Sequence, residues 1–118
     1  MVTFNMKDSE QGSLTLSFDC EGKWGMSDIT TEWNKKLTDE ELIKAYDYIL
    51  EVLEEYNLKA TFGIVGAFTE TKKEFFQNSL SQFKGSNHLD WINCSIKKIE
   101  EDPEGWFLPE ILEMIKRT

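Results

Sequence analysis

Residues 13–22 read Ser-Leu-Thr-Leu-Ser-Phe-Asp-Cys-Glu-Gly, and this stretch decides the fold that we expect. From Ser13 to Phe18, apolar side chains alternate with hydroxyl side chains, which is the period of a strand with one buried face. Asp19 then lies at the carboxyl end of this predicted strand. Residues 20–37 contain two glycines and two tryptophans without a regular period, which predicts a long loop.

A helix and a second strand follow this loop. Thr38 and Glu41 form a capping box, and apolar residues recur at helical spacing after it, which predicts a helix that Asn57 ends. Residues 60–65 read Ala-Thr-Phe-Gly-Ile-Val, a short apolar run that is typical of a strand. The expected order is therefore strand, helix, strand.

The remaining sequence predicts further helices. Thr71 and Glu74 form a second capping box, and the helix that it opens ends before Gly85. The irregular stretch after it contains a short predicted helix over 96–101, and a last helix over 109–117 has proline in its first turn. Strands that alternate with helices predict an α/β fold with a parallel sheet, and ligands bind at the carboxyl ends of such strands.

Composition and charge restrict the classes of function. Residues 1–118, 40% hydrophobic and 13% aromatic, are enough for a single globular domain. The net charge of -9 repels phosphate backbones and anionic lipids, so we expect no nucleic-acid partner. No apolar run approaches the roughly 20 residues of a membrane span, and residues 1–11 are polar, so we expect no membrane partner and no signal peptide. Cys20 and Cys94 lack metal-type spacing, which favours a reduced, cytoplasmic protein.

Asp19 and Glu21 form a carboxylate pair after the first predicted strand. Alternate residues of an extended segment point the same way, so the two side chains can converge while Cys20 points elsewhere. Two carboxylates that lie close together repel each other unless they share a cation or a proton. Such a pair suits a divalent metal, or one base beside one metal ligand. Taken alone, the pattern is also common in solvated loops and helix caps.

Both predicted strands resemble segments of polysaccharide deacetylases of the NodB-homology type. In that family, a hydrophobic strand ends in Thr/Ser-Phe-Asp-Asp-Gly or an Asp-x-Asp/Glu variant, and a later strand reads Lys-Ala-Thr-Phe-Phe-x-x-Gly. Residues 14–22 resemble the first motif, and residues 56–66, Tyr-Asn-Leu-Lys-Ala-Thr-Phe-Gly-Ile-Val-Gly, resemble the second. Residues 105–110, Gly-Trp-Phe-Leu-Pro-Glu, resemble the stretch that leads to the family's histidine motif.

The resemblance implies a hydrolase that removes N- or O-acetyl groups from an acetylated carbohydrate. Asp19 would be the general base and Glu21 a ligand of a divalent metal, zinc or a similar ion, which the family also holds with two histidines of a His-x-x-x-His motif. This sequence departs from the family at residues 20–22, which read Cys-Glu-Gly where many members read Asp-Gly. Trp24, directly after the motif, is the favoured residue for stacking on the sugar.

The resemblance also implies a deformed (β/α) barrel, of which the parallel strand–helix units here would form a part. A full barrel takes about 250 residues, and this sequence has two clear units. It has one histidine, His88, so the family's metal site cannot be assembled from these residues. We therefore expect a truncated NodB-homology domain over 1–118, with an open sheet edge through which it can associate with itself.

Two other interpretations remain open at this point. The chain could be an inactive partial domain that binds a carbohydrate or a partner chain, without bound metal. An aspartyl-nucleophile phosphatase also carries Asp-x-Asp after its first strand, but it normally continues with x-Thr/Val, whereas residues 19–23 read Asp-Cys-Glu-Gly-Lys. Tryptophans in a small domain more often pack in the core than stack on sugars. Both roles remain possible for the four in this sequence: Trp24, Trp33, Trp91 and Trp106.

Overall fold

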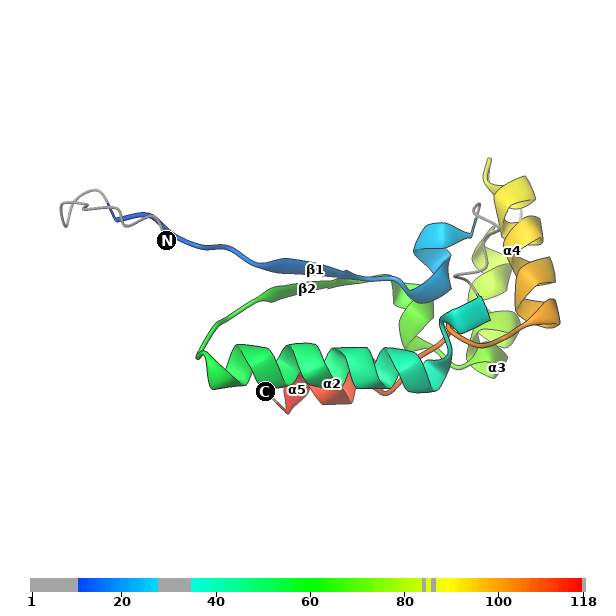
Figure 1. The fold of residues 1–118 in the computed structure, drawn as a ribbon. Coiled ribbons are helices and arrows are strands. Elements are labelled where there is room, and N and C mark those ends of the chain that lie inside the picture. Colours follow the sequence, from blue (N-terminus) through cyan, green and yellow to red (C-terminus); the bar gives the residue numbers. More distant parts are fainter. Residues whose placement is uncertain (1–10, 28–34, 84, 86, 118) are drawn as a thin grey trace.

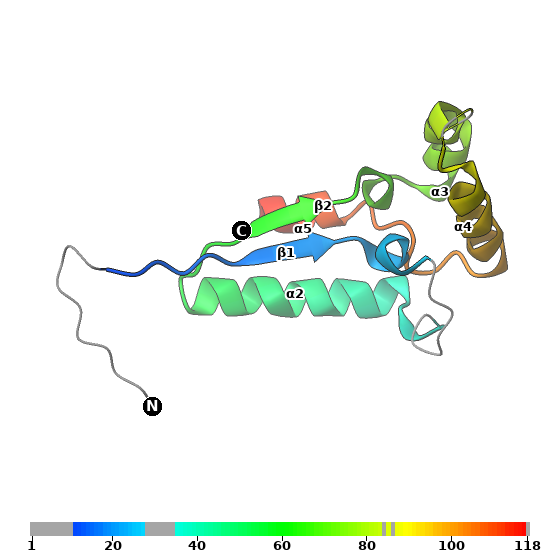
Figure 2. The same cartoon turned by 90° about the horizontal axis from the view of Figure 1, so that it is seen from above.

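The computed structural model describes residues 11–27, 35–83, 85 and 87–117, and it has a mixed α/β architecture. Two parallel strands, β1 (Ser17–Cys20) and β2 (Thr61–Ile64), form the sheet, and helix α2 (Asp39–Glu55) lies between them in the chain. Helix α2 and the short helix α5 (Ile111–Lys116) pack side by side against one face of this sheet (Figure 1). Figure 2 shows α2 running alongside β1, with α5 behind β2.

The other helical elements lie beyond the carboxyl ends of the two strands (Figure 1). Helix α4 (Leu89–Glu101) is the longest of them. The rest are single turns or short helices: η2 (Gly22–Met26), η3 (Gly66–Thr69), α3 (Lys72–Glu74), η4 (Phe75–Ser79) and η5 (Leu80–Phe83). Among the described residues, no helix is both long enough and apolar enough to cross a membrane.

The sheet is parallel, as predicted, but its first strand begins later than the sequence pattern indicated. The pairing runs from Ser17, opposite Thr61, to Cys20, opposite Ile64. The expected strand over 13–18 is therefore wrong in its bounds, because residues 13–15 lie beyond the pairing with β2, and Leu14 is 72% exposed. The alternation itself is correct, and it continues through the motif.

Alternation along β1 sets which side chains face the helices. Phe18 is half-buried and stacks on Phe62 of β2 at a ring-centroid distance of 5.5 Å, and Cys20 is fully buried. Ser17 and Asp19, which point the other way, are exposed. The predicted base therefore lies on the face of the sheet that α2 and α5 leave open.

Thr38 and Thr71 cap the two helices as predicted, and the threonine half of each capping box is confirmed. The Thr38 hydroxyl accepts a hydrogen bond from the Glu41 N–H at 3.2 Å, and the Thr71 hydroxyl accepts one from the Glu74 N–H at 3.1 Å. Each satisfies an N–H group that the first turn of a helix leaves without an intrahelical partner. Asn57 follows the end of α2, as predicted, and its φ of 52° is the left-handed conformation common beyond helix ends.

Three other helix predictions need correction. The helix opened by Thr71 changes from α to π and then to 3-10 geometry before Gly85. Helix α4 replaces most of the predicted irregular stretch, because three residues at helical spacing, Ile92, Ser95 and Ile99, are buried. The last helix begins at Ile111, after its predicted proline. The predicted loop over 20–37 contains η2, and its residues 28–34, Trp33 among them, lie outside the described residues.

The turn at residues 102–105 connects three parts of the fold. The Gly105 N–H donates to the Asp39 carboxylate at 2.8 Å, and the Asp39 N–H donates to the Glu104 carboxylate at 2.8 Å. On its other side, the buried Lys23 ammonium pairs with Asp102 at 3.1 Å. These contacts hold η2 against the start of α2, although their partners are far apart in sequence.

Asp39 makes the stability of this turn depend on pH. Burial raises the pKa of the Asp39 carboxyl, as do the Glu104 and Glu110 carboxylates, while the Gly105 hydrogen bond lowers it. The folded protein therefore binds this proton more tightly than the unfolded chain does. The stabilisation that results is present in acid and is lost as the pH rises from the ordinary value of 3.8 through the raised pKa.

Asp39→Asn should remove this titration. Relative to the wild type, we expect the variant to gain stability as the pH rises above the ordinary value of 3.8, by less than about 1 kcal/mol because solvent screens a partly exposed group. Urea unfolding at several pH values measures the difference, with Asp47→Asn, on the exposed side of the same helix, as the matched control. A variant that instead loses stability relative to the wild type as the pH rises would contradict the assignment.

Candidate functional site

The carboxyl end of β1 presents Asp19 to solvent. Asp19 lies opposite Gly63 of β2 in the register of the sheet, and both residues are exposed. A Cβ atom built on Gly63 would lie 3.5 Å from Asp19 Oδ1, so the absence of a side chain at Gly63 leaves space beside the carboxylate. Asp19 takes part in none of the ion pairs among the described residues. Its oxygens are therefore accessible to a ligand or to water.

The Glu21 side chain lies against η2, whereas Asp19 lies beside β2. It follows β1 directly and precedes the first turn of η2. A Cβ atom built on Gly25 would lie 1.6 Å from Glu21 Oε2, so the carboxylate occupies the space that a side chain at Gly25 would need. The two acids of the motif are thus placed beside different neighbours, Asp19 beside β2 and Glu21 on η2.

Cys20, between the two acids, faces the core and not the site. Its thiol is fully buried, and it donates a hydrogen bond to the Phe18 carbonyl at 3.9 Å. Burial raises the pKa of Cys20, and burial also raises the pKa of Tyr46 well above its usual range. Both groups are therefore neutral near pH 7, so Cys20 does not present the thiolate that a nucleophile requires.

The side chains around Asp19 do not fit the family's metal site. Zinc sites of hydrolases use three protein ligands, most often with histidine among them. Within the described residues, no group of three or more histidine, cysteine, aspartate and glutamate side chains is placed to hold a metal ion. His88, the one histidine of the sequence, is the residue before α4. Asp19 and Glu21 alone do not complete a coordination shell.

Trp24 lies in an aromatic cluster. It is 6% exposed, and its indole N–H donates to the Trp106 carbonyl at 2.7 Å. Its ring contacts four others at centroid distances between 5.0 and 6.2 Å: Phe75, Trp91, Trp106 and Phe107. Stacking of Trp24 on a sugar stays a prediction, and it would require this cluster to open.

Glu70 is a third carboxylate beyond the strand ends, and sequence reasoning missed it. It follows η3, its Oε1 accepts a hydrogen bond from the Ser79 hydroxyl, and its Oε2 is buried without a hydrogen-bond partner. A buried carboxylate oxygen without a partner is costly. In the sequence, Glu70 reads as an ordinary residue before a capping box, so no local pattern distinguishes it.

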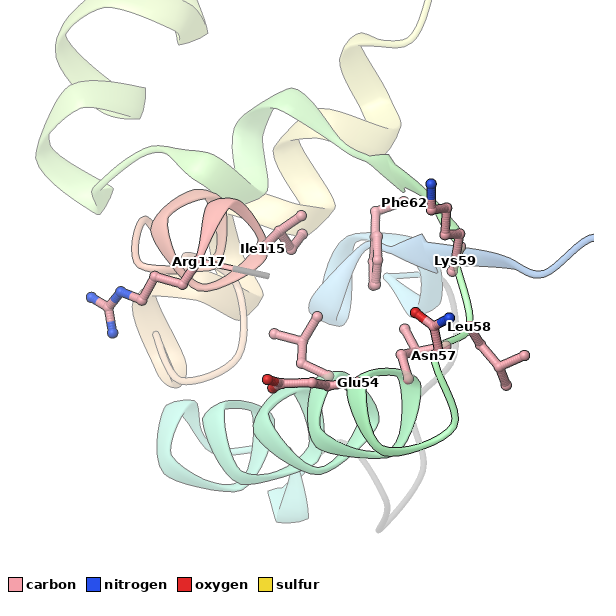
Figure 3. Close-up of a pocket in the computed structure, with 10 residues that line it drawn as sticks. Glu54, Asn57, Leu58, Lys59, Phe62, Ile115 and Arg117 are labelled. Atoms are coloured by element: carbon pink, nitrogen blue, oxygen red, sulfur yellow. The ribbon is translucent and has the colours of Figure 1, made fainter.

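A pocket of about 480 Å³ lies at the other end of the sheet (Figure 3). It is formed by the end of α2, the loop before β2, the side chain of Phe62 and the end of α5. Its walls are formed by both apolar and polar groups, with Glu54, Lys59 and Arg117 among its lining residues. None of the three predicted site residues lines it.

The chain was compared with protein-family models, curated proteins and solved structures. No family model, no curated protein and no solved structure matches the chain, so the assignment of a function depends on its own residues and fold.

Proposed function

We propose that this chain carries the general base of a carbohydrate deacetylase, a hydrolase that removes N- or O-acetyl groups from a sugar. The observation that carries the proposal is the accessible carboxylate of Asp19 at the carboxyl end of a parallel strand, beside the space left by Gly63. Ligands of open α/β sheets bind outside these strand ends. The resemblance of both strand segments to polysaccharide deacetylases supplies the reaction class.

The chemistry assigned to Asp19 is proton abstraction. Its carboxylate accepts a proton from a water molecule while the water oxygen bonds to the acetyl carbonyl carbon. The C–N or C–O bond to the sugar then breaks, the proton passes to the departing amine or hydroxyl, and acetate is released. A positioned general base contributes roughly 10²- to 10⁴-fold to such a rate. The family's metal ion has no complete set of ligands here, so no step is assigned to it.

We further propose that β1 and β2 belong to a larger, deformed (β/α) barrel. In support, each strand pairs on one edge only among the described residues, and α2 and α5 cover one face of the sheet. Unpaired edges of this kind invite additional strands. Histidine ligands for a metal would then have to come from residues outside these 118.

A second candidate function is non-catalytic binding of a carbohydrate or of a partner chain. It is favoured by the absence of a metal-binding group among the described residues and by the two unpaired strand edges. Self-association through such an edge is the simplest form of partner binding. Binding without acetate release distinguishes this function from the first.

Two measurements test the first function. Penta-N-acetylchitopentaose is titrated into isotopically labelled protein, and amide shifts are expected at Asp19 and Gly63. Acetate release from acetylated oligosaccharides is then followed with and without zinc, and Asp19→Asn should lower the rate by about 100-fold or more. Ser17→Ala, on the same exposed face of β1, is the matched control and should leave the rate unchanged.

The outcomes separate the two functions. Acetate release that survives Asp19→Asn would show that Asp19 is not the base. Oligosaccharide binding at the strand ends without any acetate release would support the binding function. A protein that neither binds nor hydrolyses the oligosaccharide would refute both assignments to carbohydrate.

A further inference from the structure

We propose that Trp91 is the stacking platform for a sugar ring of a polymeric substrate. This inference rests on the proposed function, because it names a second contact of the same glycan at the same end of the sheet. It moves the sugar-stacking role from Trp24, which the sequence pattern favoured, to a tryptophan in the first turn of α4.

Exposure distinguishes Trp91 from the other tryptophans that the structure describes. Trp24 and Trp106 are buried, whereas Trp91 is 41% exposed. A large exposed aromatic side chain leaves apolar surface in water, which is unfavourable in the free protein. The C–H groups on the face of a sugar ring can cover this surface, because the face of an aromatic ring carries partial negative charge.

The ring of Trp91 is supported from behind. It lies 6.2 Å from the ring of Trp24 at an interplanar angle of 39°. Trp24 is itself held by its hydrogen bond to the Trp106 carbonyl and by an edge contact with the Trp106 ring at 5.0 Å. A ring backed in this way loses little conformational entropy when a ligand stacks on it.

The position of Trp91 relative to Asp19 suits a chain of sugars. Helix α4 lies beyond the carboxyl ends of β1 and β2, the end at which Asp19 is exposed (Figure 1). Trp24, which contacts Trp91, belongs to η2, and η2 follows Asp19 and Glu21 directly in the chain. Trp91 therefore lies at the same end of the sheet as the proposed site, in contact with the ring of Trp24 on η2.

Charge restricts the glycan further. The net charge of -9 and the acids Asp19, Glu21 and Asp90 repel anionic polysaccharides. A neutral N-acetylated amino-sugar polymer meets no such repulsion, and its deacetylated, amine-bearing form is attracted. We therefore assign Trp91 to a polymer of N-acetylated amino sugars.

Binding of two ligands to four proteins tests the platform. Isothermal titration with penta-N-acetylchitopentaose and with monomeric N-acetylglucosamine compares the wild type with Trp91→Leu, Trp91→Tyr and Leu89→Ala. Trp91→Leu keeps an apolar side chain on Trp24 but removes the flat ring, so we expect it to weaken binding of the pentamer by roughly two- to tenfold. Trp91→Tyr should retain most of the affinity, and the monomer should be unaffected.

Leu89→Ala is the matched control, since Leu89 is 42% exposed on the same helical turn. If Trp91→Leu and Leu89→Ala lose equal affinity for the pentamer, or if neither loses any, Trp91 is not the stacking platform. The Asp19 assignment is unaffected by that result if the pentamer still shifts the amide signals of β1 and β2. A wild-type protein that does not bind the pentamer refutes the proposed function and, with it, this inference. Circular dichroism establishes that each variant is folded before it is titrated.

Discussion

Trp24→Ala is expected to lower the free energy of unfolding by about 3–5 kcal/mol, the range for removing a large buried aromatic side chain. Trp24 joins η2 to the segment around Trp106 and to Phe75, and it is 6% exposed. Its loss leaves a cavity, and the Trp106 carbonyl loses the indole N–H that it accepts. Because this cluster also supports the end of β1, the Asp19 region should open together with it.

Urea unfolding followed by circular dichroism measures this effect without relying on tryptophan emission. Trp24→Phe keeps a ring in the cluster but removes the hydrogen bond, so it should lie between the wild type and Trp24→Ala. Tyr48→Ala is the control, because Tyr48 is 68% exposed and its loss should change stability by about 0.5 kcal/mol or less. A Trp24→Ala protein as stable as Tyr48→Ala would show that the cluster does not hold the fold together.

Gly22→Ala is expected to destabilise the protein by about 2–5 kcal/mol through two separate causes. Gly22 has a φ of 55°, which is strained for a residue with a Cβ atom. A Cβ atom there would also lie 2.3 Å from the Gly105 carbonyl oxygen and 2.6 Å from the Phe68 ring. The backbone oxygen cannot move aside without breaking the Lys23–Gly105 hydrogen bond of 2.8 Å, so the chain must shift around the motif.

Two other glycines separate strain from collision. Gly85 has a φ of 83° but nothing within 4 Å of a built Cβ atom, so Gly85→Ala should cost only the strain, about 1–2 kcal/mol. Gly66 has neither feature, so Gly66→Ala should stay within about 0.5 kcal/mol of the wild type. Thermal unfolding ranks the three variants. Equal effects at Gly22 and Gly85 would mean that the close approach at Gly22 is relieved without cost.

Features that depend on neighbours in the sequence were predictable. Each N-cap bond needs only a hydroxyl and an N–H group three residues apart, so Thr38 and Thr71 could be assigned without knowledge of the fold. The direction in which Asp19 points follows from the two-residue period of the strand, and the exposed Asp19 with the buried Cys20 agrees with it. These are short-range properties of an extended or helical backbone.

Features that depend on distant partners were not predictable. The start of β1 is set by where β2 can pair with it, so the alternating pattern extended the predicted strand too far toward Leu14. Helix α4 was expected as a short segment because its buried face becomes apparent only when the helix packs. Glu70 reads as an ordinary loop residue, and only the folded chain buries one of its oxygens.

For the motif at the end of β1, the sequence predicts the local structure but not the neighbours of each side chain. By itself, the sequence determined that Asp19 and Glu21 come at the carboxyl end of a strand, that two helices begin at threonine caps, and that one histidine is present. Only the tertiary structure decided that Asp19 lies beside Gly63 and Glu21 against Gly25, and that Trp24 is buried while Trp91 is exposed. The physical reason is that burial and proximity are set by contacts such as Trp24 with Trp106, 82 positions apart, which no local pattern encodes.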